Sequence, residues 1–388
     1  MGNATTTPPA LLPEVRRTTR ELRRMAAGAL ARMYRPAEGM FAFRCRRTTY
    51  GPVAEGVSRR YTCTALVALS HEAPDVRGQV LGGHSVDDLC ERMVKGIDTA
   101  EDLGEVALAL WAARALHHAH ASIALARLQA MEVSGRPWPT VELSWALGAL
   151  TAEDDATDDP ALADRLARRL LDAYRPDSGL FAHGPAGGKA ERLRAHVGDF
   201  ADFVYPIFAL ATWARRSGKD EALAVARHSA ERMCQLQGDE GQWWWHFDVR
   251  NGSIIERFPV YAVHQDAMAP MALLALADAC GDRHNEAIAR GLHWLVDPPE
   301  TSEPLIDADE GIIWRKVARR EPVKLARGLQ AAASRLHPRL RAPGLDVLLP
   351  PGVVDYESRP YHMAWILYAW TPRRIEQFGG GEAPEGVE

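Results

Sequence analysis

The sequence predicts an all-α protein, an (α/α)6 toroid built from six helical hairpins. Helical hydrophobic periods dominate the chain, and strand signals are scarce. Helices with one polar face alternate with helices that are apolar almost all round. A helix of the first kind suits an outer layer, and one of the second kind must be enclosed by other helices. Six such pairs, closed on themselves, give the toroid.

Each predicted helix follows from its pattern and its end signals. Ser85 caps a helix that carries Asp87 and Asp88 in its first turn, and Pro13 and Pro36 bracket the first helix. The outer helices are predicted at residues 13–34, 85–97, 121–134, 161–175, 222–237 and 284–298. The inner helices are predicted at residues 57–70, 101–118, 138–152, 198–216, 261–280 and 358–370.

The domain organisation follows from these elements. Residues 13–371 are predicted to form a single toroid domain, after a flexible leader at 1–12. A longer connector near 299–356 is expected to hold one extra helix near 322–336. The Gly- and Glu-rich stretch 372–388 is predicted to be a disordered tail.

Composition narrows the function class. The net charge of −5 comes from mixed signs along the chain, so we expect no nucleic-acid partner. Five cysteines without CxxC spacing indicate a reducing compartment. Because no stretch has 18 apolar residues and no signal peptide is evident, we expect no membrane span and a cytoplasmic protein.

A short motif recurs after turns rich in Pro, Asp and Glu, and it combines a glycine with a following aromatic residue. Its copies are Gly39-Met-Phe41, Gly179-Leu-Phe181, Gly241-Gln-Trp243 and Gly311-Ile-Ile-Trp314. The glycine allows a tight turn, and the aromatic ring is expected to wedge between neighbouring helices. A repeat at the hairpin period supports the toroid.

Two resemblances attach to these residues. Gln237-Gly-Asp-Glu-Gly241-Gln-Trp243 resembles the Gln-xxx-Gly-x-Trp repeat of the terpenoid cyclase and protein prenyltransferase toroids. The segments 258–271 and 359–362 resemble uncharacterised bacterial toroid proteins encoded among polysaccharide-synthesis genes. Six-hairpin glycosidases, epimerases and polysaccharide lyases share the architecture, so the fold does not choose among these chemistries.

The candidate site lies where the inner helices begin. Their N-termini are predicted to gather at one end of the toroid, with free N–H groups and positive partial charge. The candidate catalytic residues there are Asp199, Asp202, His264, Asp266 and His362. The candidate substrate-binding residues are Trp243, Trp244, Trp245, His246, Tyr205, Tyr261, Gln265, Arg59, Asp102, Arg359 and Tyr361.

Three functions are compatible with these residues at one end of the toroid. The first is an enzyme acting on a carbohydrate or uronic acid by general acid/base chemistry, as a hydrolase, lyase or epimerase, because carboxylate, His, Tyr, Arg and Trp together suit sugars. The second is a terpenoid cyclase or prenyl-transfer enzyme with a deep aromatic cavity. The third is a non-catalytic toroid with a filled centre that binds a glycan or a partner.

Comparison with the rival families supplies further expectations. The Asp-x-Asp-Asp acid of class II terpene cyclases is absent, and Asp307-Ala-Asp309-Glu310 belongs to a turn. Tyr361-His362 resembles part of the prenyltransferase zinc site, but Asp278-Ala-Cys280 lies at the wrong end of its helix. We predict no cofactor and no metal, with His264, Asp266 and His362 as the alternative if a metal is held. The expected ligand is a small molecule or an oligosaccharide.

Overall fold

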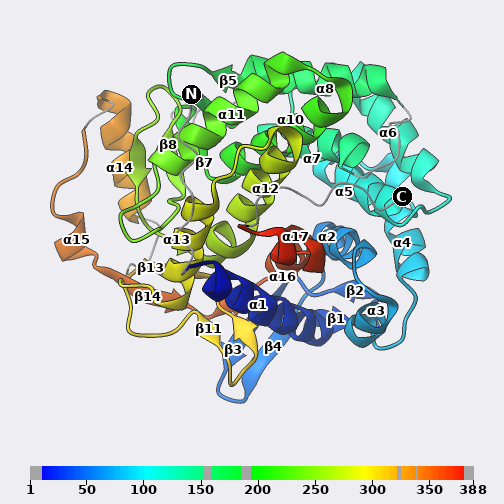
Figure 1. Cartoon of the computed structure of the whole chain (residues 1–388), viewed down its shortest axis with the longest axis horizontal. Helices are drawn as coiled ribbons and strands as arrows, with labels where there is room; N and C mark the ends of the chain where they lie inside the picture. Colours follow the sequence, from blue (N-terminus) through cyan, green and yellow to red (C-terminus); the bar gives the residue numbers. More distant parts are fainter. Residues whose placement is uncertain (1–10, 153–158, 185–193, 321–324, 338–339, 380–388) are drawn as a thin grey trace.

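The computed structural model describes residues 11–152, 159–184, 194–320, 325–337 and 340–379. Within these residues, six inner helices each pack against the next, and the last returns to the first, which closes a ring (Figure 1). A π-helical turn, η2 (His264–Met268), leads into the fifth of these helices. In order they are α2 (Arg59–Ser70), α5 (Leu103–Ala115), α7 (Thr140–Thr151), α10 (Ala201–Ser217), α12 (Ala269–Cys280) and α16 (Pro360–Ala369).

An outer layer of helices covers this ring and confirms the predicted (α/α)6 toroid. Each outer helix buries its apolar stripe on inner helices and turns its charged face outward. The outer helices are α1 (Leu11–Met33), α4 (Val86–Val94), α6 (Ala121–Val133), α8 (Pro160–Ala173), α11 (Asp220–Gln235) and α13 (Asn285–Val296). In the part of the chain that the structure describes, no helix is both long and apolar enough to cross a membrane.

In the described part of the chain, four further α-helices lie outside the hairpin scheme. The predicted extra helix of the connector is α14 (Leu325–Leu336), and the short α15 (Leu345–Leu348) follows it. The helices α3 (Pro74–Leu81) and α17 (Pro372–Gln377) were not predicted.

The helix α17 corrects the prediction that disorder begins at residue 372. Thr371 caps it, and Pro372 occupies its first turn, where proline is well tolerated. The side chain of Arg16 in α1 donates to the carbonyl oxygens of Glu376 (2.9 Å) and Phe378 (3.0 Å). These bonds fix the chain up to residue 379, whereas residues 1–10 and 380–388 lie outside the described part.

The glycine repeat forms short β-hairpins after outer helices. The hairpins are β1 (Tyr34–Arg35) with β2 (Met40–Phe41), β5 (Tyr174–Arg175) with β6 (Leu180–Phe181), and β11 (Ile306–Asp307) with β12 (Ile312–Ile313). Their registers pair Tyr34 with Phe41, Tyr174 with Phe181, and Ile306 with Ile313. Ile313, and not Trp314, is therefore the structural equivalent of the repeated aromatic residue. Phe41, Phe181 and Ile313 are all fully buried.

Three small sheets lie where inner helices begin. One joins β7 (Val197–Asp199), β8 (His246–Asp248) and β9 (Ile254–Glu256). The second joins β10 (Val260–Tyr261), β13 (Lys316–Arg319) and β14 (Pro351–Asp355), and the third joins β15 (Glu357–Ser358), β3 (Arg44–Thr48) and β4 (Gly51–Glu55). Because β7, β10 and β15 run directly into α10, η2 and α16, the sheets surround the N-terminal end of the ring.

Contacts between first turns show that the inner helices open at one end, which we call the mouth. Arg60 at the start of α2 forms ion pairs with Asp102, the cap of α5, and with Glu142 in the first turn of α7. Tyr61 of α2 and Tyr361 of α16 have ring centroids 5.0 Å apart. These contacts, with those of α10 and η2 described below, bring the six starts together.

Aromatic side chains fill the centre of the ring beneath the mouth. The indole of Trp111 lies 5.5 Å from the ring of Phe208, 5.6 Å from that of Trp365 and 5.7 Å from that of Tyr368. These side chains come from α5, α10 and α16 and are at most 7% exposed. Apolar burial on this scale accounts for ring closure.

Replacing the repeat glycine Gly179 with alanine should lower the free energy of unfolding by about 2–3 kcal/mol, measured by urea denaturation. Its φ is +74°, and an added Cβ would lie 2.8 Å from Cβ of Arg232. Gly218→Ala is the matched control, because Gly218 has a φ of +66° with open space around it. Equal losses in the two variants would show that the contact with α11 contributes nothing.

Candidate functional site

Two carboxylates at the start of α10 hold each other in place. The side chain of Asp199, at the end of β7, accepts from the backbone N–H groups of Ala201 (3.0 Å) and Asp202 (3.3 Å). Oδ2 of Asp202 accepts in return from the backbone N–H of Asp199 (2.9 Å). An Asp-x-x-Asp sequence at a helix start can make these reciprocal bonds, as a capping box does. The turn thus fixes both side chains at the mouth.

A histidine from another hairpin completes this cluster. Nδ1 of His183, which follows β6, lies 2.9 Å from Oδ2 of Asp202. The hydrogen bond to Asp202 and the negative charge of that carboxylate raise the pKa of His183 to about 9. Asp202 is 2% exposed, whereas the imidazole of His183 is half exposed. At neutral pH the pair is therefore an imidazolium on a buried carboxylate.

Asp199 has a very different proton affinity from an ordinary aspartate. Burial, and then repulsion by the charge of Asp202, raise its pKa to about 7, although the charge of His183 acts in the opposite direction. Two neighbouring carboxyl groups, one of which has a raised proton affinity, are a usual arrangement for acid/base chemistry. Asp199 can therefore give or take a proton near neutral pH.

The same three side chains are the candidate metal ligands of the described chain. The ligand atoms of His183, Asp199 and Asp202 lie within 4.8 Å of one another. In this arrangement Nδ1 of His183 is bonded to Oδ2 of Asp202, so that a metal would have to displace this hydrogen bond. The trio His264, Asp266 and His362 does not form such a group among the described residues.

Aromatic and neutral imidazole rings line the wall beside Asp199. His246 pairs with Asp199 across the strands and stacks on Trp245 at 4.0 Å. Trp245 presents its edge to Tyr261 at 5.0 Å, and His264 lies 5.1 Å from Tyr261. Burial lowers the pKa of both His246 and His264 to about 3, so both rings are uncharged at physiological pH.

A chain of charged groups forms the next part of the wall. The guanidinium of Arg315 lies 5.2 Å from the centre of the Tyr261 ring and donates to Oε1 of Glu357 (2.8 Å). Nε of Arg359 donates to the same oxygen (2.7 Å). Arg359 also lies 4.1 Å from the Phe43 ring, and it donates to the hydroxyl of Tyr61 (3.1 Å). Two arginines and aromatic faces thus share one side of the mouth.

The position four residues after each repeat glycine supplies a side chain to this region. In order these side chains are Phe43, His183, Trp245 and Arg315. Sequence reasoning selected Trp245 and missed the other three. An alignment of the four copies on their glycines would have identified Phe43, His183 and Arg315. Each lies two residues after the buried residue of its copy, where the chain leads toward the mouth.

Three more candidates lie at the mouth in supporting positions. Tyr361 packs on Tyr61, and the hydroxyl of Tyr205 accepts from Nε1 of Trp365 (2.9 Å). Asp102 accepts from the backbone N–H of Glu105 (2.7 Å) and pairs with Arg60, so it caps α5.

Four candidates differ from the prediction because packing turns them away from the mouth. Trp243 is 1% exposed. The side-chain amide of Gln265 accepts from the backbone N–H of Trp243 (3.0 Å) and donates to the carbonyl oxygen of Trp243 (3.2 Å), so both residues have a structural role. Trp244 packs edge-on against Phe258 and lines a separate outer cavity. Arg59 donates to the carbonyl oxygens of Met93 (3.1 Å) and Lys95 after α4.

Asp266 and His362 form a buried pair and are not exposed to a ligand. Nε2 of His362 lies 2.8 Å from Oδ2 of Asp266, and the two residues are 2% and 0% exposed. Burial raises the pKa of Asp266, and the charge of His362 opposes this shift. The pair joins η2 to α16, which closes the ring at its last contact.

Comparison with known proteins gives structural neighbours alone. No protein-family profile and no curated protein matches the chain. An unsaturated glucuronyl hydrolase specific for heparin matches with a TM-score of 0.58 and 12% identity, over 96% of this chain and 97% of that one. The unsaturated glucuronyl hydrolase of Bacillus sp. GL1 matches with a TM-score of 0.57 and 11% identity, over 92% and 97%.

A third neighbour is a variant of the Streptococcus agalactiae unsaturated glucuronyl hydrolase in complex with dGlcA-GalNAc6S. It has a TM-score of 0.53 and 9% identity, over 98% of this chain and 94% of that one. At such low identities these likenesses show the fold, and they agree with the closed ring of hairpins described above.

The His183–Asp202 pair can be tested by NMR titration. The imidazole of His183 should titrate near pH 9 in the native protein and near its ordinary pH of about 6.5 in Asp202→Asn, since the neutral amide cannot stabilise the imidazolium. Asp355→Asn, which removes a carboxylate paired with Lys316, should leave this midpoint unchanged. An unchanged midpoint in Asp202→Asn would contradict the pairing.

The buried Asp266–His362 pair should behave as a structural unit. His362→Ala leaves a buried carboxyl group without its partner and should cost roughly 3–5 kcal/mol of unfolding free energy. The double variant Asp266→Leu with His362→Leu should lose much less, because no charged or polar group is then stranded. Urea denaturation of both variants checks this, and a larger loss in the double variant would refute it.

Proposed function

We propose that the protein is a carbohydrate-active enzyme that transfers a proton at the mouth of the toroid, with Asp199 as general acid or base. The supporting observation is the pKa of about 7 for Asp199, beside a buried carboxylate that an imidazolium compensates. A group with this affinity is protonated in part of the population at neutral pH and ionised in the rest, which suits proton transfer to or from a substrate.

The walls of the mouth suit a sugar, and a uronic acid in particular. Trp245 is partly exposed and Phe43 is 42% exposed, so their rings can contact a pyranose, whereas Tyr261 is 6% exposed and supports Trp245 from behind. Arg315 and Arg359 lie beside them, and their guanidinium groups suit a substrate carboxylate, although both already bond to Glu357. Stacking surfaces next to fixed charges are what recognition of an anionic saccharide requires.

Among hydrolase, lyase and epimerase, we favour the hydrolase. The solved neighbours are named as unsaturated glucuronyl hydrolases, and one is described as responsible for glycosaminoglycan degradation. Such a hydrolase needs a proton donor, and Asp199 has the affinity for that role. Substrate and water would meet at Asp199, while Asp202 and His183 hold the first turn of α10, and the charge of Asp202 keeps the proton affinity of Asp199 high.

The alternatives have less support. A cyclase for an isoprenoid needs a deep aromatic cavity, but Trp111, Phe208, Trp365 and Tyr368 fill the centre of the ring. A filled centre is also what a non-catalytic toroid would have. The Asp199–Asp202 pair favours the enzyme over that alternative, because two adjacent carboxyl groups, one of them with a raised pKa, suit proton transfer.

Asp199→Asn should lower turnover of an unsaturated glucuronyl disaccharide by roughly 10²-fold or more and leave the melting temperature nearly unchanged. Asp159→Ala is the control for loss of a structural cap, because Asp159 caps the outer helix α8 by accepting from the N–H of Leu162 (2.8 Å). It should cost about 1 kcal/mol of stability and retain activity. Loss of stability without selective loss of activity in Asp199→Asn would refute the proposal.

The pH dependence then separates acid from base. If Asp199 is the general acid, turnover falls as pH rises through about 7, and if it is the base, turnover rises there. In Asp202→Asn the repulsion that raises the pKa of Asp199 is removed, so the change in turnover should occur at lower pH. If turnover of the parent protein shows no rise or fall near pH 7, the assignment of Asp199 is contradicted.

A further inference from the structure

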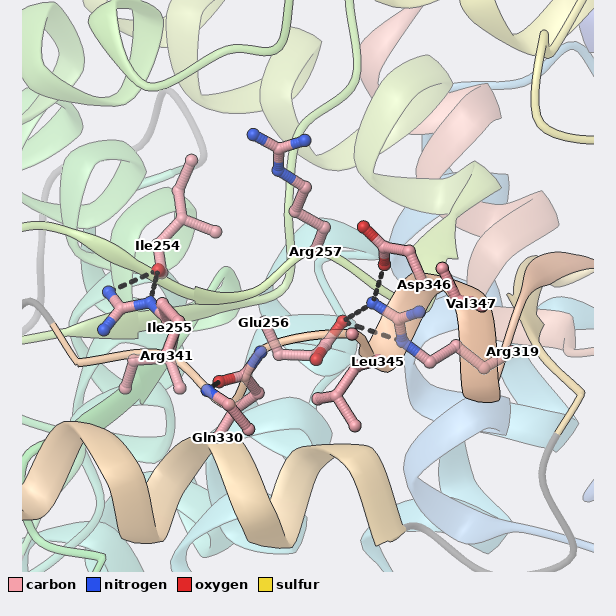
Figure 2. A pocket seen from close by; sticks show the side chains of 12 residues that line it. Ile254, Ile255, Glu256, Arg257, Arg319, Gln330, Arg341, Leu345, Asp346 and Val347 are labelled. Carbon is pink, nitrogen blue, oxygen red and sulfur yellow. Dashed lines mark hydrogen bonds and ion pairs between the residues drawn. The ribbon is translucent and has the colours of Figure 1, made fainter.

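A polar cleft opens beside β9, the edge strand of the sheet that carries Asp199, and neither the mouth nor the reaction accounts for it. Its volume is about 560 Å³. It lies between β9, the strand β13, the helix α14 and the short α15 (Figure 2). The polar residues that line it are Glu256, Arg257, Arg319, Gln330, Arg341 and Asp346.

A buried carboxylate in this cleft has one oxygen without a partner. Oε1 of Glu256 accepts from Nη2 of Arg319 (2.8 Å) and from the backbone N–H of Phe258 (3.0 Å). Oε2 of Glu256 has no hydrogen-bond partner, although Glu256 is 2% exposed. Since a buried charged oxygen without a partner is costly, this atom points to a ligand that donates a hydrogen bond.

Other groups of the cleft are held in position, as a binding site requires. Arg319 is 7% exposed and bonds Glu256, Asp346 (2.8 Å) and the carbonyl of Leu349 (2.9 Å). Gln330 is 8% exposed, and its Oε1 accepts from the backbone N–H of Ala342 (2.9 Å). Figure 2 shows Gln330 and Arg319 on either side of the Glu256 carboxylate. Three polar groups of the cleft, Glu256, Arg319 and Gln330, are thus buried and held in place by hydrogen bonds.

A second cavity, of about 360 Å³, adjoins the first and shares Ile254 and Arg257 with it. Trp244, which the sequence placed at the mouth, lines this second cavity. The guanidinium of Arg257 lies 5.6 Å from the centre of the Trp244 ring, and within the described chain it forms no ion pair. An exposed cation and an aromatic ring therefore lie beside the segment that carries the carboxylate without a donor.

The cleft is close to the mouth through one row of residues. Asp199 pairs with His246 in the sheet, and His246 pairs with Glu256. Neighbouring strands lie about 4.8 Å apart, so the backbones of Asp199 and Glu256 are roughly 10 Å apart. Residues opposite each other on adjacent strands share a face of the sheet. Saccharide units bound at the two places could therefore belong to one chain.

We propose that this cleft is a second saccharide site that binds a hydroxylated, negatively charged sugar unit. A sugar hydroxyl donates to Oε2 of Glu256, and the carboxylate of the sugar binds the guanidinium of Arg257. A neutral sugar lacks the second contact, and a simple carboxylate such as acetate lacks the first. The proposal does not depend on the reaction at Asp199, and its unit is either a distal part of the mouth substrate or a separate molecule.

Calorimetric titration with D-glucuronate tests this on the full chain carrying Asp199→Asn, so that no turnover occurs. Glu256→Gln and Arg257→Ala should each weaken glucuronate binding about 10-fold or more, because each removes a charge-assisted hydrogen bond. D-glucose and acetate should bind at least about 10-fold more weakly than D-glucuronate. Glu303→Gln is the matched control, since Glu303 is exposed and lies outside the cleft, and it should bind as the parent does.

The outcome is decisive even if one variant misfolds. Arg257 is exposed, so Arg257→Ala should fold even if Glu256→Gln disrupts the pair with Arg319. Parent-like binding of D-glucuronate by Arg257→Ala, or equal binding of D-glucose, overturns the proposal. With active protein, a raised KM and unchanged kcat for a tetrasaccharide in Arg257→Ala assign the cleft to the mouth substrate. Unchanged KM, with glucuronate binding lost, assigns it to a separate saccharide.

Discussion

Closure of the inner ring is the constraint on which the rest of the molecule depends. Each inner helix is enclosed by two neighbouring inner helices and an outer layer, so its body must be apolar. Polar groups cost less free energy in the first turns, where the helix leaves the core. The mouth is therefore rich in carboxylates, imidazoles and arginines, because these turns are where such groups escape the cost of burial.

Within the mouth, chemical character depends on how buried charges are compensated. The buried side chain of Asp202 has compensation, since His183 and the backbone N–H of Asp199 bond the same oxygen. Asp199 lacks such an ion-pair partner, so burial and repulsion raise its pKa to about 7. His246 and His264 stay neutral for a related reason, since no carboxylate offsets their burial. Titratable groups within one region thus differ widely in proton affinity, from His183, whose pKa is raised, to His246 and His264, whose pKa is lowered.

The glycine repeat connects architecture with the site. In each copy the glycine makes the turn, the residue two positions later enters the core, and the residue four positions later reaches the mouth; three of the copies form β-hairpins, and the Gly241 copy is a turn without strands. The core position keeps one requirement, to be apolar, whereas the mouth position varies among Phe43, His183, Trp245 and Arg315. One structural unit, used repeatedly, therefore supplies unrelated chemical groups to a single surface.

The sequence by itself determined the toroid, because hydrophobic periodicity reports directly which helices are enclosed. It also located the first turn of α10 and the stretch from Trp245 to His264, where polar residues interrupt apolar helices. Tertiary structure alone decided which of three adjacent tryptophans faces the mouth and that Asp266 pairs with His362 inside the ring. It also decided that His183 reaches Asp202. Pairings between distant residues depend on how hairpins pack, and local periodicity carries no record of that packing.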